Sequence, residues 1–280
     1  MEGVAEIRRL RLLVGGGENA VVELVEIEGL PFVLKRAPPT RVAGERLFQR
    51  TMAEAGLPAL ATPDHPSLAP DELLLEYVEG SPTIGGAPMP EGAARWGAAV
   101  AGLHGIAIDR FQRFEDNAPV NANWREFVDW LVERALSTPR DTEHDLPKPL
   151  LVEAARRLAA LRDFRPKRCV LLHGDLHANN ALLRGAETIL FDRASRIWSG
   201  PAVFDLALVF SEGFPGARYE VDRPGDDACL AAFMAAYGEL PEDEAPFLDH
   251  FALAHALLRY PSPFVPDLRQ IIEAALTRIA

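Results

Sequence analysis

The residues with the clearest chemical potential lie in a polar loop between two short apolar runs. The runs, Cys169–Leu172 and Ala181–Leu183, have the length of buried strands. The loop carries the carboxylate of Asp175 and the carboxamide of Asn180, and a third strand-like run ends at the carboxylate of Asp192. A succession of strand, loop, strand, turn and strand would bring these three polar side chains close together at one edge.

That trio suits the transfer of a phosphoryl group. The reaction needs an acceptor for the proton of the substrate hydroxyl. It also needs oxygen ligands for Mg²⁺, which bridges the phosphates and offsets the developing charge. The pattern therefore predicts Asp175 as the catalytic residue and Asn180 and Asp192 as metal ligands.

Residues 173–180 read His-Gly-Asp-Leu-His-Ala-Asn-Asn, and an aspartate follows at a strand end. This stretch resembles the aminoglycoside phosphotransferase and choline kinase superfamily, whose pattern His-Gly-Asp-x-His-x-x-Asn is met at every fixed position. The resemblance implies a small-molecule kinase with a protein-kinase-like α+β fold in two lobes. It implies a nucleotide-binding lobe over residues 1–75, with a small antiparallel sheet and one helix, then a hinge at 76–80 and a larger, mainly helical lobe at 81–280.

The two histidines of this stretch also allow a different interpretation. His173 and His177 are four residues apart, as in the His-Glu-x-x-His helix of a zinc site. That motif needs a helix and a glutamate after the first histidine, whereas Gly174 follows His173 at the end of a strand-like run. Phosphoryl transfer is therefore favoured. The resemblance implies that His173 is structural, and no catalytic role is assigned to His177.

Three strands are predicted near the N-terminus, over residues 7–13, 20–28 and 32–35. A glycine-rich turn joins the first two strands. It is either a simple hairpin turn or, as the resemblance implies, a flap in which the backbone of Gly16 and Gly17 approaches the ATP phosphates. It is not a P-loop, because no Gly-Lys-Ser/Thr closes it.

Lys35 is one of only three lysines in the chain, and it ends an apolar strand. Its ammonium either reaches the solvent from a sheet edge or, as the resemblance implies, binds the α- and β-phosphates as a point charge. Thr40 is predicted to cap a helix that runs to about Ala55. The resemblance implies that Glu45 of this helix pairs with Lys35, and the alternative is an ordinary solvated glutamate.

The run Glu72–Gly80 predicts a buried strand that leads into a turn. In the resembling family this stretch is the hinge, which implies Leu75 beside the adenine and the backbone C=O of Glu76 and N–H of Val78 on the base edge. An ordinary sheet strand is the alternative. The spacing of apolar residues then predicts helices at Pro90–Gly105, around 124–135 and 151–162, and through much of 205–280.

The chain departs from the family pattern directly after Asp192. An aromatic residue and an acid usually follow there, whereas Arg193 follows here. Arg193 would weaken metal binding, point away from the site or contact a phosphate, which leaves the metal stoichiometry open. Residues 199–207 then resemble the family's Gly-x-Pro and Asp-Leu-Ala segment, which implies that Asp205 caps a helix and braces the catalytic loop.

The composition indicates a globular, soluble protein. Of 280 residues, 48% are apolar, yet no apolar run spans a bilayer and no hydrophobic leader follows Met1, so a cytoplasmic location and no membrane partner are expected. The net charge of −12 argues against nucleic-acid binding. Cys169 and Cys229 are the only cysteines, and they are expected to be reduced and buried.

Most of the net negative charge lies in the last part of the chain. Residues 201–280 hold 13 acids and 5 bases, in the region that builds the substrate wall in the resembling family. A cleft of one sign attracts a substrate of the other sign, which favours a cationic acceptor; a solvated acidic surface would have the same composition. Glu212, Asp226 and Asp227 are weak candidates for contacts with this acceptor.

Together these observations predict an ATP- and Mg²⁺-dependent kinase that phosphorylates a hydroxyl of a small, cationic acceptor; GTP in place of ATP stays open, as does a monomer or a homodimer. An aminoglycoside or another basic antibiotic is the first choice, which would make the protein a resistance enzyme. Choline, ethanolamine or homoserine is the alternative. A choline kinase would need an aromatic cage, for which the candidates are Trp124, Trp130, Trp198 and Tyr219. A kinase-like binding protein without turnover is a further alternative.

Overall fold

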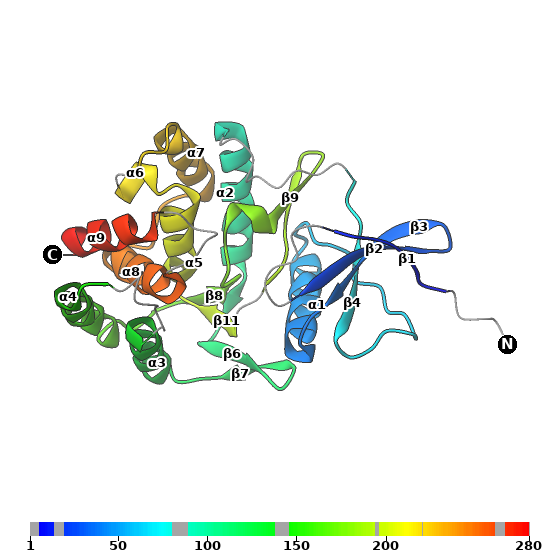
Figure 1. Ribbon diagram of the computed structural model, residues 1–280, viewed down its shortest axis with the longest axis horizontal. Coiled ribbons are helices and arrows are strands. Elements are labelled where there is room, and N and C mark those ends of the chain that lie inside the picture. The colour runs from blue at the N-terminus through cyan, green and yellow to red at the C-terminus, as the bar shows by residue number, and fades with distance from the viewer. Residues whose placement is uncertain are drawn as a thin grey trace.

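The computed structural model describes residues 6–13, 20–79, 89–137, 146–193, 196–219, 221–260 and 267–279. Figure 1 shows a small sheet with one helix at the N-terminal end of the molecule and a larger, mainly helical part at the C-terminal end. This is the predicted α+β arrangement. Strand β4 and helix α2, which follow each other in the chain, lie on the two sides of the junction between the parts (Figure 1).

The N-terminal sheet is antiparallel, with the strands in chain order. Its strands are β1 (Arg8–Leu12), β2 (Val21–Ile27), β3 (Leu30–Arg36) and β4 (Glu72–Glu76). Strands β2 and β3 form a hairpin whose turn places Gly29 at φ +81°, a backbone conformation that glycine adopts without strain. The predicted strands are confirmed, although β1 is exposed on both faces and β4 is shorter than the run Glu72–Gly80.

Helix α1 (Pro39–Glu54) lies between β3 and β4 in the chain. The prediction that Thr40 caps it is wrong: the N-cap is Pro38, Thr40 lies inside the first turn, and no side chain bonds the free N–H groups there. Pro39 replaces such a cap, because its ring fixes a helical φ and it has no N–H to satisfy. The helix ends before Gly56, which has a φ of +74°.

Two further sheets lie in the larger part. One has five strands in the order β5-β8-β11-β6-β7, and the other is the β9–β10 hairpin. The bounds are β5 (Ala107–Ile108), β6 (Gln112–Glu115), β7 (Ala118–Asn121), β8 (Cys169–Leu171), β9 (Ala181–Arg184), β10 (Glu187–Leu190) and β11 (Ile197–Gly200). The strand runs that flank the polar loop therefore belong to different sheets, and the loop crosses from one sheet to the other.

Helices form the rest of the larger part, as the apolar spacing predicted. They are α2 (Pro90–Gly105), α3 (Trp124–Ser137), α4 (Lys148–Leu158), α5 (Ala202–Leu208), α6 (Gly216–Tyr219), α7 (Asp226–Tyr237), α8 (Leu248–Arg259) and α9 (Leu268–Arg278). Helices α2 and α7 pack closely because Gly97 has no side chain; a Cβ there would lie 2.3 Å from the carbonyl oxygen of Phe233. None of the helices within the described ranges is long and apolar enough to cross a membrane.

Candidate active site

The polar loop after β8 is held by a buried carboxylate from α5. Asp205 is fully buried and accepts the backbone N–H groups of His173 and Gly174, both at 2.7 Å. Burial would raise the pKa of Asp205, but the hydrogen bond and charge of His104 outweigh it and leave that pKa lowered. The predicted bracing of the loop is present. The predicted helix cap is not, because Asp205 lies within the first turn of α5 and Pro201 is the N-cap.

The two histidines of the loop have different surroundings. His173 is fully buried, and its Nε2 donates to the backbone carbonyl of Phe191 at 2.8 Å, which ties the loop to the end of β10. His177 Nε2 lies 3.8 Å from Oδ2 of Asp175. The histidines lie in a loop and not in a helix, and the described segments contain no cluster of three or more His, Cys, Asp or Glu side chains suited to a metal ion. The zinc interpretation therefore has no structural support.

Asp175 and Asn180 lie next to each other in this loop. Asn180 is 5% exposed, and its Nδ2 donates to the backbone carbonyl of Asp175 at 2.9 Å. The amide oxygen of Asn180 is therefore the atom of this side chain that can bind a cation. The backbone carbonyl of Asn180 accepts the N–H of Phe191 at 3.0 Å, so Asn180 lies beside the residue that precedes Asp192. The loop thus brings Asp175 and Asn180 to the chain segment that carries Asp192.

A cation from α8 reaches the side chain of Asp175, a contact that sequence analysis did not predict. Arg259, the last residue of α8, donates through Nη2 to Oδ1 of Asp175 and through Nη1 to Glu212 at 2.9 Å. Burial would raise the pKa of Asp175, but the positive charges of Arg259, His177 and His173 outweigh it and leave that pKa lowered. Asp175 is therefore held as a carboxylate. Arg259 is separated from it by 84 residues, and no motif marks it.

Lys35 joins the N-terminal sheet to the larger part of the molecule. Its Nζ lies 2.5 Å from a carboxylate oxygen of Glu45 and 2.5 Å from Oδ1 of Asp192, although Asp192 is 157 residues away in the sequence. Burial would lower the pKa of Lys35, but Glu45 and Asp192 outweigh it and leave that pKa raised. The ammonium is thus charged and only 8% of the residue is exposed, so the solvent-reaching alternative is wrong. The solvated alternative for Glu45 is also wrong, because Glu45 is 1% exposed.

Asp192 occupies the left-handed backbone region, with φ +59°, which is uncommon for a residue with a side chain. Its N–H donates to the second carboxylate oxygen of Glu45 at 2.7 Å. Arg193 points away from the carboxylate of Asp192, which is one of the three predicted alternatives: its Nε donates to the backbone carbonyl of Leu172, it is 2% exposed, and burial lowers its pKa to about 10. The Lys35–Glu45–Asp192 group is therefore fixed at both the side chain and the backbone of Asp192.

The three residues predicted to contact the adenine lie at the end of β4 and just after it: Leu75, Glu76 and Val78. Leu75 is buried and pairs with Val33 across the sheet, while Glu76 and Val78 are half-buried. The side chain of Glu76 accepts a hydrogen bond from Arg184 of β9 at 3.1 Å, which links the end of β4 to the larger part. Half-buried apolar side chains from both parts pack against a buried cluster that includes Leu75 and Ile189: Ala20, Val33, Val78, Leu182 and Phe191. This arrangement leaves apolar surface between the two parts.

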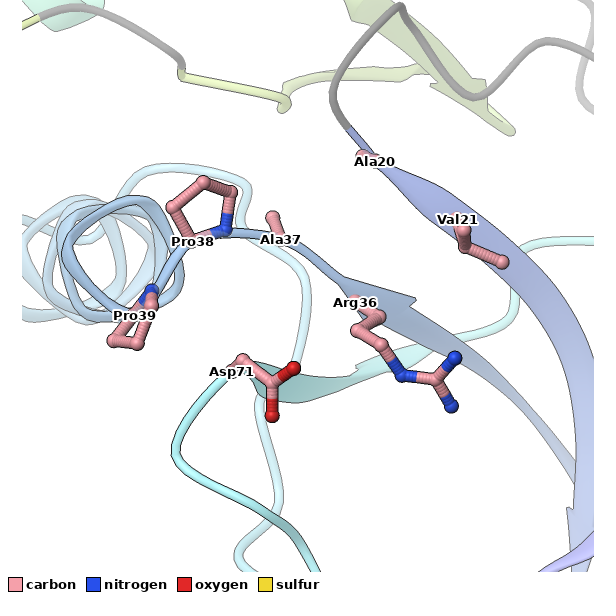
Figure 2. Close-up of a pocket in the computed structure, with 7 residues that line it drawn as sticks. All are labelled: Ala20, Val21, Arg36, Ala37, Pro38, Pro39 and Asp71. Carbon is pink, nitrogen blue, oxygen red and sulfur yellow. The ribbon is translucent and has the colours of Figure 1, made fainter.

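The glycines predicted to approach phosphates, Gly16 and Gly17, lie outside the described residues. A hollow of about 380 Å³ lies between the start of β2 and the turn from β3 into α1 (Figure 2). It is lined by Ala20, Val21, Arg36, Ala37, Pro38, Pro39 and Asp71. None of the predicted site residues lines this hollow, so it is separate from the group around Lys35.

The aromatic and acidic candidates are mostly structural. Trp124, Trp198 and Tyr219 are buried in the core, and Trp130 is 52% exposed on α3, so the four do not form a cage. Asp226 is buried and accepts the N–H of Gly216, and Asp227 is exposed. Glu212 alone is brought to the site, through Arg259. Both cysteines are free and buried, as predicted.

Lys35, Glu45 and Asp192, which the fold brings together, all lie in the part of the chain that a family model matches. A model of the phosphotransferase enzyme family matches residues 9–248, a span that contains all of these residues. The chain belongs to this family. Its members include small-molecule kinases, and the predicted membership of the aminoglycoside phosphotransferase and choline kinase superfamily is confirmed.

Solved structures of this superfamily share the fold of this family member. The aminoglycoside phosphotransferase APH(4)-Ia matches with a TM-score of 0.67 and 17% identity, over 99% of this chain and 93% of that one. A putative fructosamine-3-kinase from Thermobifida fusca matches with a TM-score of 0.63 and 19% identity, over 98% and 94%. A choline/ethanolamine kinase family protein from Mesorhizobium loti matches with a TM-score of 0.58 and 18% identity, over 99% and 87%. No curated protein matches the sequence.

Proposed function

We propose that this protein transfers the γ-phosphoryl group of ATP to a hydroxyl of a small, cationic acceptor, with Mg²⁺. The observation that carries the proposal is the buried contact of Lys35 with both Glu45 and Asp192. Burying an ammonium between two carboxylates carries a large desolvation cost, so such a group is weak evidence for stability. Its presence instead indicates a functional purpose. A phosphate chain beside this group supplies that purpose, because Lys35 then balances phosphate charge.

The residues act mainly by position and charge. Asp175 accepts a hydrogen bond from the acceptor hydroxyl, orients it and takes its proton. Lys35, which is fixed by Glu45, binds the α- and β-phosphates and neutralises their charge. Phosphoryl transfer has little covalent chemistry for the protein to perform, so fixed charges and orientation account for the acceleration.

The donor atoms around Asp192 fit Mg²⁺. This ion prefers hard oxygen ligands and is often bound by one or two protein ligands together with substrate phosphates and water. The carboxylate of Asp192, whose side chain is 37% exposed, and the amide oxygen of Asn180 supply such oxygens. We propose these two residues as the ligands. When bound, Mg²⁺ offsets the negative charge that accumulates on the phosphates.

A nucleotide between the two parts of the molecule accounts for the apolar surface there. The adenine packs beside Leu75, and the backbone C=O of Glu76 and N–H of Val78 bond its edge, while Gly16 and Gly17 approach the phosphates. Related structures support a nucleotide: APH(4)-Ia has been crystallised with ADP and hygromycin B, and the amicoumacin kinase hAmiN with AMP-PNP and Ca²⁺. We retain the division into a nucleotide lobe at 1–75, a hinge at 76–80 and a C-terminal lobe at 81–280.

An aminoglycoside or another basic antibiotic is the acceptor that we propose, with a cytoplasmic location and a role in resistance. The acidic residues 201–280 and the carboxylate of Glu212 near Asp175 favour a cationic molecule. A choline-type acceptor is less favoured because three of the four aromatic candidates are buried in the core. The non-catalytic alternative loses its main support, since Arg193 points away from Asp192.

The test is ATP consumption with a panel of aminoglycosides, choline, ethanolamine and homoserine. We expect at least one basic acceptor to raise turnover, and Asp175→Asn to lower it by about 10²- to 10⁴-fold while ATP still binds. The exposed Asp163→Asn is the matched control, and it should behave as the wild type. Wild-type protein that binds ATP but phosphorylates no acceptor would support the non-catalytic alternative. An Asp175→Asn variant with full turnover would exclude Asp175 as the base.

A further inference from the structure

Arg193 is a buried cation at the point where this chain departs from its family. It follows Asp192 directly, and only 2% of it is exposed. Its Nε donates to the backbone carbonyl of Leu172 at 3.1 Å, and its Nη2 donates to the carbonyl of Ile197. The guanidinium carbon lies 4.6 Å from the ring centroid of Trp198. Arg193 therefore contacts two other segments, the residue that follows β8 and the start of β11.

These anchor points are the segments that build the site. Leu172 directly precedes His173, where the catalytic loop begins, and Ile197 and Trp198 form the start of β11. A Cβ at Gly44 of α1 would lie 3.6 Å from Nη1 of Arg193, so α1 also reaches the guanidinium. The nearby negative charges are those of Asp205 and Glu45, the carboxylates that hold the catalytic loop and Lys35.

The backbone of Asp192 needs such an anchor. A left-handed conformation is unfavourable for a residue with a Cβ, so φ +59° persists where neighbouring contacts hold it. On one side, Glu45 accepts the N–H of Asp192 at 2.7 Å. On the other side, the chain is held by the buried Arg193. The carboxylate of Asp192 is thereby kept beside Lys35.

We propose that Arg193 is a positioning residue that fixes the carboxylate of Asp192 for a Mg²⁺-bound nucleotide, by anchoring the chain after Asp192 to the end of β8 and the start of β11. This inference rests on the proposed function, and it assigns a purpose to the buried guanidinium at the position where the family pattern is broken. In this role Arg193 acts through the backbone of Asp192 and is not itself a ligand of the nucleotide or the metal.

The experiment measures the affinity for a fluorescent N-methylanthraniloyl derivative of ATP, once with Mg²⁺ and once with EDTA. Removal of a residue that orients a metal ligand weakens metal binding by about 10- to 100-fold. The effect of Mg²⁺ is the ratio of the nucleotide affinity with Mg²⁺ to the affinity with EDTA. We expect Arg193→Met to reduce this ratio by about tenfold or more and to leave the affinity in EDTA unchanged. Arg193→Lys, which keeps the charge but not the fork or the planar stacking, should lose less.

Arg165→Met is the matched control, because Arg165 also donates to two backbone carbonyls, those of Arg162 and Phe164, but lies in the loop before β8. It should keep the full effect of Mg²⁺. An unchanged Mg²⁺ effect in the folded Arg193 variants would overturn the inference. If Arg193→Met does not fold, Arg193→Lys decides in the same way. Wild-type protein that binds no nucleotide, or whose binding Mg²⁺ does not strengthen, would instead overturn the proposed function, and this inference with it.

Discussion

At the scale of single residues, the site is a chain of opposite charges in which each group is held by the next. Lys35 lies between Glu45 and Asp192, and Arg259 lies between Asp175 and Glu212. Buried ions are stable only when they are paired in this way. Glu212 is the group whose hydrogen bonds are least satisfied. Its side chain is 5% exposed, and its Oε1 has no hydrogen-bond partner within the described residues.

Glu212 should make stability depend on pH. Burial, which outweighs the charge of Arg259, raises the pKa of Glu212 from 4.5 to about 7, and Asp175 adds to this effect. The folded state therefore binds this proton more tightly than the unfolded state, so the contribution to stability is present below about pH 4.5 and is lost as the pH rises through 7. We expect the free energy of unfolding of the wild type to fall relative to Glu212→Gln by about 3 kcal/mol across this range.

Urea denaturation at a series of pH values measures this difference. Glu133→Gln, at an exposed position of α3, is the control and should follow the wild type at every pH. A difference between wild type and Glu212→Gln that does not change with pH would mean that Glu212 is an ordinary carboxylate in the folded protein.

At the scale of elements, α1 connects the two halves of the site. Glu45 of α1 contacts Lys35 and the backbone of Asp192, and the ring of Phe48 lies 5.5 Å from the ring of His173, edge to face. Gln49, one turn after Glu45, is 1% exposed and donates to the carbonyl of Leu190 at 2.9 Å. Helix α1 is thus attached to the polar loop after β8 and to the end of β10.

Gln49→Leu should loosen this attachment. In the wild type, the carboxamide of Gln49 bonds two buried backbone groups, the carbonyl of Leu190 and the N–H of Leu60. Both groups lose this partner in the variant. We expect the free energy of unfolding to fall by about 2 kcal/mol, and ATP affinity to fall because α1 no longer fixes Glu45. Urea denaturation and fluorescent nucleotide binding measure the two effects. Gln112→Leu, which removes a hydrogen bond between exposed side chains, should alter neither; equal ATP affinity in Gln49→Leu and the wild type would refute the coupling.

At the scale of the whole molecule, the two parts differ in the size of their hydrophobic cores. The large hydrophobic cluster lies in the C-terminal part and includes Phe48 and Met52 of α1, whereas the N-terminal sheet has two small clusters. Strand β1 is exposed along its whole length, while β8 is buried throughout. Local opening costs least where little apolar surface is buried. The N-terminal sheet should therefore be the less stable part.

Hydrogen exchange followed by mass spectrometry tests this view. Amides of β1 should exchange fastest among the strands and those of β8 slowest. Addition of Mg²⁺ and ATP should slow exchange in β3 and in the β9–β10 hairpin together, because the ligand binds the folded form and contacts both parts. Asp192→Ala should reduce this protection, because it removes a proposed ligand of Mg²⁺. Protection confined to one part would contradict a nucleotide site between them.

The sequence by itself determined many of the elements and the central loop, but not the strands β5, β6, β7 and β11. Apolar spacing gave the strands β2 to β4 and β8 to β10 and the helix Pro90–Gly105, because these patterns depend on neighbours in the chain. The loop with Asp175 and Asn180 was readable because its polar residues are consecutive. Thr40 was misassigned as a helix cap since Pro39 provides a different local solution.

Tertiary structure alone decided which distant charges meet. The contact of Arg259 with Asp175, the clamp formed by Gln49 and the burial of Arg193 join residues across separate elements. No local sequence pattern distinguishes these side chains from solvated ones, because polar and charged residues also occur on the exposed faces of helices. Only packing, which removes water and fixes the elements against one another, determines which of these groups must find a partner and which partner is within reach.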